Sequence, residues 1–337
     1  VFAGTGIQER RVGITQTGGQ CRASNYYPVI RKALVDAGFE QVPVISAAMS
    51  SNVRSNQPGF KLDFKNIAVI AFDAILFGDC LSKLYHSTAV RIENPSLALE
   101  LKNQYLQEAK PIVLEKDRKG LIALLKNAVK EFNKLLPEEY LERKKVGIVG
   151  EIFLKFHPFA NQNIVAWLMS QKIEVIPPTL TPFMTQFFVN RDSKLENNVD
   201  TSSIPNPIMK LLYVLVKKEI EKFNNIISKF KYYSPIEDIY ELADEVKNII
   251  PLIAQFGEGW VLPAEIVSLA RNKADGVISL QPFGCIANHI ISKGVENKIK
   301  QLYPDLSLLS LDFDSGVSEV NVVNRLMLLK DSMSKKA

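Results

Sequence analysis

The stretch Lys145-Val146-Gly147-Ile148-Val149-Gly150 decides the fold, because it predicts the first strand of a βαβ unit. The residues that follow it, 151–163, are predicted to form a loop that opens a helix extending to about Ser170. Ile173-Glu174-Val175-Ile176-Pro177 is predicted to be the next strand. A strand, a helix and a second strand in this order indicate a parallel sheet with a right-handed crossover.

An equivalent unit is predicted earlier in the chain, within residues 11–46. Val12-Gly13-Ile14-Thr15 is a short β-prone run, and the glycines at 18 and 19 interrupt it. Apolar residues in Tyr26–Ala37 recur at the i, i+3, i+4, i+7 positions of an amphipathic helix, and Gly38 stands where a C-cap glycine belongs. The residues Val42–Ser46 are predicted to form the second strand.

The remaining segments extend this pattern. Residues from about 65 to 136 have a helical pattern, and the charged segment 137–145 is predicted to connect two domains. Strands are predicted at 276–280 and 306–313, each followed by a helix. We therefore expect an α/β protein with two lobes, each built on a parallel sheet flanked by helices, plus helical insertions. The expected domains are residues 1–143 and 144–337.

Composition excludes several classes of protein. The chain has 337 residues, of which 47% are hydrophobic and 23% charged, which is ordinary for a globular protein and unlike a disordered one. Lysine and arginine exceed aspartate and glutamate by five. This weak positive bias permits an acidic ligand such as a phosphorylated cofactor, but it does not indicate a nucleic-acid-binding protein.

Cysteine content and hydropathy bear on the compartment. The three cysteines, Cys21, Cys80 and Cys285, are too few and odd in number for a secreted disulfide scaffold. The longest apolar run, near residues 67–72, is far shorter than a membrane span, and no signal peptide opens the chain. We expect a cytoplasmic protein with no membrane partner. Because the chain begins at Val1 without a methionine, we also expect it to be an excised fragment.

Two cysteines follow predicted strands. In open α/β sheets, ligands bind at the carboxyl ends of the strands. Cys21 and Cys285 lie at such ends, next to glycines and at the start of a predicted helix, where the free N–H groups favour the thiolate. A role as a metal ligand and a role as a small buried apolar residue are both open for these two. Cys80 lies among apolar residues of a helix and is interpreted as core.

Other candidate residues lie in the same kinds of position. Glu151 follows a strand and is either catalytic or a cap of the next turn. Glu258 lies in the glycine-rich stretch 257–260, which either approaches a ligand or is simply a tight loop. His289 follows Cys285 by four residues and is either an acid near the site or a surface histidine. His157 in its loop, and the acidic residues of 312–319, have similar alternatives. No dinucleotide fingerprint, P-loop or lipase-type nucleophile motif is present.

Taken together, six motifs resemble a known family, the cluster-binding subunits of the 2-hydroxyacyl-CoA dehydratases. The resemblance is closest to the homologous C-terminal region of the long CoA-substrate-specific enzyme activases, and it covers residues 11–328. The motifs are Thr17-Gly18-Gly19-Gln20-Cys21-Arg22, Val149-Gly150-Glu151-Ile152-Phe153, Pro158-Phe159-Ala160-Asn161, Gly257-Glu258-Gly259-Trp260, Gln281-Pro282-Phe283-Gly284-Cys285-Ile286-Ala287-Asn288-His289 and the segment 312–321.

The resemblance implies two flavodoxin- or Rossmann-like lobes with an iron–sulfur cluster, such as a [4Fe–4S] cluster, held by cysteines from both. Cys21 and Cys285 match two ligand positions. Glu151, Glu258 and His289 are then candidates for the catalytic polar wall. The implied partner is an ATPase activator domain of the acetate-kinase/Hsp70-like fold, either on a separate chain or on the same polypeptide. It supplies electrons for the anaerobic reduction or dehydration of an acyl-CoA. A cluster normally needs three or more thiolates. We therefore expect a further ligand upstream of Val1 and a fragment without a cluster.

Three functions remain open on the sequence. The first is an iron–sulfur redox module, acting as a reductase or a dehydratase-like lyase in its parent protein. The second is a non-catalytic region that docks the ATPase domain or a CoA thioester. The third is a structural zinc site at the same cysteines, for which the absence of a Cys-x-x-Cys pair is a poor signature.

Overall fold

A computed structural model of the chain describes residues 11–16, 21–48, 64–199, 205–314 and 316–334. The chain divides into two compact units, Val1–Phe64 and Lys65–Ala337. Both contain parallel strands and helices, so the α/β class expected from the sequence is confirmed.

The smaller unit contains the predicted early βαβ pattern. Its elements are β1 (Val12–Gln16), the 3₁₀-helix η2 (Arg22–Asn25), α1 (Tyr26–Asp36) and β2 (Val44–Ala48). The two strands pair in parallel with Val12 opposite Val44. Gly38 adopts φ +76° just after α1, the left-handed conformation in which a glycine typically ends a helix. Residues 17–20 of the first motif lie outside the described part of the chain.

The larger unit is built on a four-stranded parallel sheet. Its strands are β3 (Lys145–Gly150), β4 (Glu174–Ile176), β5 (Gly276–Pro282) and β6 (Ser307–Phe313), in the order β4-β3-β5-β6. The chain leaves β3 towards β4 on one side and returns to β5 on the other. The carboxyl ends of β3 and β5 therefore form the switch point at which open α/β sheets bind ligands.

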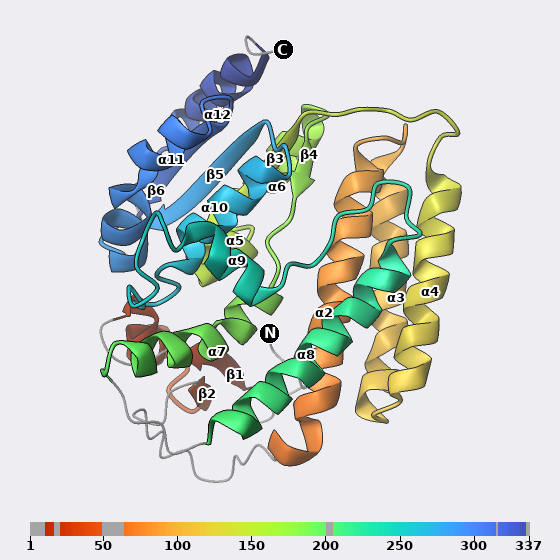
Figure 1. The fold of residues 1–337 in the computed structure, drawn as a ribbon. Helices are drawn as coiled ribbons and strands as arrows, with labels where there is room; N and C mark the ends of the chain where they lie inside the picture. Colours follow the sequence, from red (N-terminus) through yellow and green to blue (C-terminus); the bar gives the residue numbers. More distant parts are fainter. Residues whose placement is uncertain (1–10, 17–20, 49–63, 200–204, 315, 335–337) are drawn as a thin grey trace. The chain divides into compact units, whose positions relative to one another are not determined.

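Helices cover both faces of this sheet (Figure 1). They are α5 (Ile152–Phe156), α6 (Ile164–Ser170), α10 (Val261–Arg271), the π-helix η3 (Ala287–Ser292), α11 (Glu296–Leu302) and α12 (Glu319–Ser334). On one face, Ile278 packs in a core with Leu168 of α6 and Leu326 of α12. On the other face, Val277 packs with Ile266 of α10 and Ile299 of α11. Successive residues of β5 thus enter different cores, as the two-residue period of a strand requires.

The other helices form a second layer of the same unit. They are α2 (Phe64–Ala89), α3 (Pro95–Leu114), α4 (Arg118–Leu135), α7 (Thr181–Glu196), α8 (Asn206–Ile227) and α9 (Ile239–Val246). Apolar side chains of α2, α3, α4 and α8 share one core, in which Leu125 of α4 and Phe223 of α8 are fully buried. The units therefore divide at residues 64/65, whereas the sequence places its boundary at 143/144. The difference arises because α2–α4 bury their apolar faces against α8.

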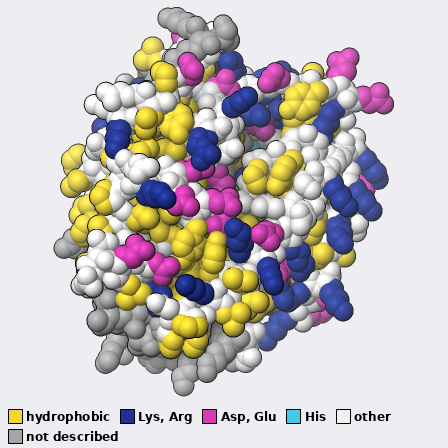
Figure 2. All heavy atoms as spheres, viewed as in Figure 1, with side chains coloured by type: hydrophobic (Ala, Val, Ile, Leu, Met, Phe, Trp, Pro, Cys, Tyr) yellow, Lys and Arg dark blue, Asp and Glu magenta, His cyan; other side chains and the backbone are white. Residues whose placement is uncertain are grey.

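Helices α3 and α4 carry many of the positively charged side chains on the surface of the larger unit. Figure 2 shows many Lys and Arg side chains on the side of the molecule where α3 and α4 lie. Exposed lysines of α4 at positions 119, 126, 130 and 134 contribute to it. None of the helices in the described part of the chain is long and apolar enough to cross a membrane.

Candidate functional site

Strand β3 ends on a glycine that no other residue replaces without strain. Gly150 has φ +132°, and a Cβ atom there would lie 2.1 Å from the carbonyl oxygen of Leu280 in the neighbouring strand. The backbone of Glu151 then donates to the same oxygen at 3.1 Å. The turn therefore directs Glu151 towards the carboxyl end of β5, where the sequence places its site.

Glu151 caps the short helix that follows it. Its Oε2 atom accepts a hydrogen bond of 2.8 Å from the backbone N–H of Leu154, and the residue is buried. The capping role, one of the two alternatives that the sequence left open, is thus present in the structure.

Glu258 comes to the same place from the glycine-rich loop. Gly257 and Gly259 both adopt positive φ, and a Cβ atom on Gly259 would lie 2.1 Å from the carbonyl oxygen of Ala254. This tight loop places Glu258 Oε1 2.7 Å from the backbone N–H of Ile152, from which it accepts a hydrogen bond. The structure thus brings two predicted site residues, Glu151 and Glu258, together at the N-terminus of α5.

Burial makes Glu258 unusual as an acid. Its side chain is only 3% exposed, and desolvation raises its pKa to about 7, with the negative charge of Glu151 adding to the effect. Lys155 opposes this shift and is the main charge that lowers the pKa. A carboxyl group with a pKa near neutrality is suited to exchanging protons as a general acid or base.

Lys155 and Glu265 belong to the same environment, and the sequence did not single them out. Lys155 Nζ lies 3.2 Å from Glu265 Oε1, and both side chains are largely buried. Burial raises the pKa of Glu265, while Lys155 lowers it. These residues are 110 positions apart and carry no local motif, so only the fold reveals the pair.

Cys285 lies just beyond the end of β5. Gly284 adopts φ +75°, and the Cys285 backbone N–H donates to the carbonyl oxygen of Pro282 at 3.1 Å. The thiol side chain is 5% exposed and packs with Leu262 and Ala287. The helix predicted to follow this strand is interrupted, because η3 ends at Ser292 and α11 begins at Glu296.

Polar side chains near Cys285 have unused hydrogen-bonding atoms. Gln281 and Asp312 are register partners on β5 and β6, and so lie on one face of the sheet. Gln281 is 1% exposed, yet neither atom of its amide finds a partner among the described residues. The buried Oδ1 of Asn288 is likewise unpaired within this part of the chain. Buried polar atoms without a hydrogen-bond partner are rare in native interiors, and they indicate a bound polar ligand or ordered water.

The predicted histidines occupy different surroundings. His289 Nε2 lies 3.5 Å from Asp312 Oδ1, so His289 faces the end of β6. Its backbone N–H donates to the carbonyl oxygen of Cys285 at 2.8 Å. His157, by contrast, is exposed, stacks on Phe153 and accepts a hydrogen bond from the backbone of Ala160.

The other two cysteines differ from Cys285. Cys21 lies in the smaller unit, half-buried, at the N-cap of η2, and its carbonyl oxygen accepts a hydrogen bond from the backbone of Ser24. Cys80 is fully buried in the core of α2, where desolvation raises the pKa of its thiol. The interpretation of Cys80 as a core residue is confirmed.

The residues present supply only part of an iron–sulfur site. Within the described ranges, no three His, Cys, Asp or Glu side chains converge as metal ligands. The larger unit offers one thiol near the sheet end, that of Cys285, beside unpaired polar atoms that suit a polar guest. A cluster bound here therefore requires further ligands beyond those of the larger unit.

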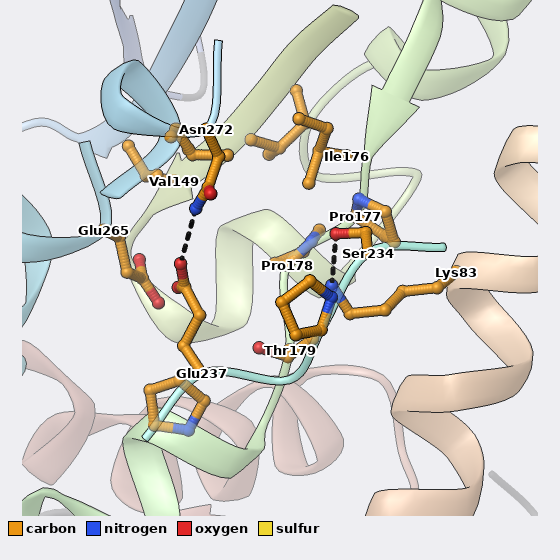
Figure 3. A pocket seen from close by; sticks show the side chains of 14 residues that line it. Lys83, Val149, Ile176, Pro177, Pro178, Thr179, Ser234, Glu237, Glu265 and Asn272 are labelled. Atoms are coloured by element: carbon orange, nitrogen blue, oxygen red, sulfur yellow. Dashed lines mark hydrogen bonds between the residues drawn. The ribbon is translucent and has the colours of Figure 1, made fainter. Parts of the chain in front are cut away.

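A small cavity lies between the sheet and the second layer of helices, with Glu265 at its wall (Figure 3). It has a volume of about 60 Å³. It is lined by Lys83 of α2, Glu237 before α9, Glu265 of α10 and Asn272, which directly follows α10. Asn272 Nδ2 donates to Glu237 Oε1 at 3.2 Å, and Lys83 Nζ donates to Ser234 Oγ at 3.3 Å. None of these residues was a sequence candidate.

Comparison of the chain with protein-family models, with curated proteins and with solved structures finds no match.

Proposed function

We propose that this chain is an iron–sulfur redox module of the kind found in 2-hydroxyacyl-CoA dehydratases. Cys285 is the proposed ligand from the larger unit, and Cys21 is the proposed ligand from the smaller one. The observation that carries the proposal is the position of Cys285 at the switch point of the sheet. There, buried polar atoms of Gln281 and Asn288 lack partners within the described residues.

The surrounding residues have definable roles in this proposal. A bound cluster supplies one-electron chemistry at low potential. Gln281 and Asn288 provide hydrogen-bonding groups that orient a polar guest at the strand ends. Glu258 holds or releases a proton near neutral pH, since burial raises its pKa to about 7. Glu151 caps the start of α5, and the Glu258 carboxylate accepts a hydrogen bond from the first residue of the same helix.

The proposed partners follow the same interpretation. An ATPase activator of the acetate-kinase/Hsp70-like fold is the proposed electron source, and an acyl-CoA is the proposed substrate. The three cysteines are free thiols, which fits a reducing compartment such as the cytoplasm. The enzymatic reaction of the parent protein would be a reduction or a dehydration.

A second function is favoured by a specific observation. No set of three metal-ligating side chains converges in the described ranges of the chain. A non-catalytic region that docks an activator domain or a CoA thioester needs no such set. In this alternative, the partner binds at the same carboxyl ends of β3 and β5, without a cluster.

Metal and sulfide analysis of the full-length, anaerobically prepared parent protein separates these functions. We expect iron together with acid-labile sulfide, in similar amounts. Zinc without sulfide would indicate the structural zinc site instead. Neither metal nor sulfide would reject the redox module and leave the docking region.

A further inference from the structure

Six ionisable side chains form a row in the larger unit, of which Lys155, Glu258 and Glu151 are buried and the other three half-buried. In order along the row they are Lys83, Glu237, Glu265, Lys155, Glu258 and Glu151. The row begins on α2, crosses α10 and ends at the carboxyl end of β3. Interiors rarely hold so many ionisable groups unless these are paired or functional.

Each neighbour in the row interacts with the next. Lys83 is the strongest charged neighbour of Glu237, and Glu265 acts on Glu237 as well. Glu265 is paired with Lys155 at 3.2 Å. Lys155 is in turn the strongest charged neighbour of Glu258, which also senses Glu151. Each group is therefore coupled electrostatically to the next, from α2 to the strand end.

The cavity joins the first half of the row. Figure 3 shows the carboxyl groups of Glu237 and Glu265 lying next to one another at its wall. Its volume of about 60 Å³ exceeds the space that one water molecule takes up in the liquid, about 30 Å³. Lys83, Asn272 and Ser234 at its wall present polar groups that form hydrogen bonds with water.

We propose that this row is an internal proton-transfer path between the cavity beside Lys83 and Glu258 at the end of β3. A proton passes from Glu237 through cavity water to Glu265. The Lys155 ammonium donates a proton to the Glu258 carboxylate and takes up the proton of Glu265, which restores its charge. Each step moves one proton and no electrons. The path stands independently of the iron–sulfur proposal.

The proton affinities along the row suit this transfer. Burial raises the pKa of both Glu237 and Glu258 to about 7, so that both carboxyl groups exchange protons near neutral pH. Burial also raises the pKa of Glu265 and lowers that of Lys83. The charged groups that face the two ends are Lys83, Glu241, Glu245 and Glu265 around Glu237, and Lys155 and Glu151 around Glu258.

A pH-jump experiment followed by infrared spectroscopy tests the path. The absorption of the protonated Glu258 carboxyl is assigned by its loss in Glu258→Gln. After a jump from above to below neutral pH, its rate of appearance is measured in the native protein and in Glu265→Gln. We expect a rate at least about tenfold lower in the variant, because a carboxamide does not take up and release protons as a carboxyl group does.

Glu245→Gln is the matched control. Glu245 also acts on Glu237 but pairs with Arg271 outside the row, so we expect its variant to keep the native rate. An unchanged rate in Glu265→Gln, or an equal loss in Glu245→Gln, would overturn the path. If Glu265→Gln does not fold, Glu237→Gln at the far end takes its place, with the same slowing expected and an unchanged rate again contradicting the path.

Discussion

Arg91 donates a hydrogen bond of 2.6 Å from Nη2 to Glu174 Oε2, and both side chains are buried. Arg91 lies two residues after α2, and Glu174 is the first residue of β4. Ser87 of α2 donates to the other carboxylate oxygen, and the Arg91 guanidinium stacks 3.7 Å from the ring centroid of Tyr232. The Arg91–Glu174 ion pair thus links the end of α2, in the second layer of helices, to strand β4 of the sheet.

Replacing Arg91 by methionine is expected to lower the free energy of unfolding by about 3–5 kcal/mol, because it leaves Glu174 buried without its counter-charge. Denaturant unfolding at neutral pH measures the change. Lys247→Met serves as the control, because Lys247 forms an exposed pair with Asp244 that is worth at most about 1 kcal/mol. A loss in Arg91→Met no larger than in the control would show that the pair does not fasten the layers.

Glu258 makes stability depend on pH in one direction. Its pKa is about 7 in the folded protein and 4.5 for an ordinary glutamate in the unfolded chain, so between these values the folded state binds more protons than the unfolded one. Stability therefore falls as pH rises through this window, by up to about 1.4 kcal/mol per pH unit for this group. Glu258→Gln is expected to flatten the fall, as measured by unfolding at several pH values. An unaltered slope would contradict the raised pKa.

His86 acts in the opposite direction. It is buried, its Nδ1 lies 2.7 Å from the carbonyl oxygen of Ser82, and desolvation lowers its pKa from 6.5 to about 4. The folded state therefore resists protonation, and stability is lost as pH falls from 6.5 towards 4. His86→Gln should lose less stability than the native protein over this range. A larger loss in the variant would be inconsistent with a neutral buried histidine.

Gln281 is expected to cost stability in the free protein. Its amide is buried with both polar atoms unpaired among the described residues. Gln281→Met keeps the shape and removes those atoms, so the free energy of unfolding should rise by about 1–3 kcal/mol. Gln104→Met on the exposed face of α3, where changes stay within about 0.5 kcal/mol, is the control. Destabilisation by Gln281→Met would show that the amide is satisfied.

The parts of the fold with a regular apolar pattern were predictable. Strand β3, helix α1 and the left-handed Gly38 follow from local sequence. Helix α7, by contrast, does not follow from local sequence. Its buried positions include polar residues such as Thr185, Gln186 and Ser193, so no apolar period marks it.

The site was predictable only where a residue directly follows a strand or lies between glycines. Glu151 and Glu258 carry that signal, and the structure brings them together on α5. Lys83 and Glu265 look like ordinary polar positions of amphipathic helices. Their burial depends on how distant helices pack, which sequence periodicity does not encode.

Iron content in cysteine variants tests the central proposal most directly. Cys285→Ser should lose iron, acid-labile sulfide and visible absorbance in the full-length, anaerobically prepared parent protein, because the serine hydroxyl is not a thiolate ligand. Cys80→Ala, which changes a thiol buried in the helical core, should keep all three. If Cys285→Ser retains the iron and sulfide of the native protein, Cys285 is no ligand and the redox-module proposal is contradicted.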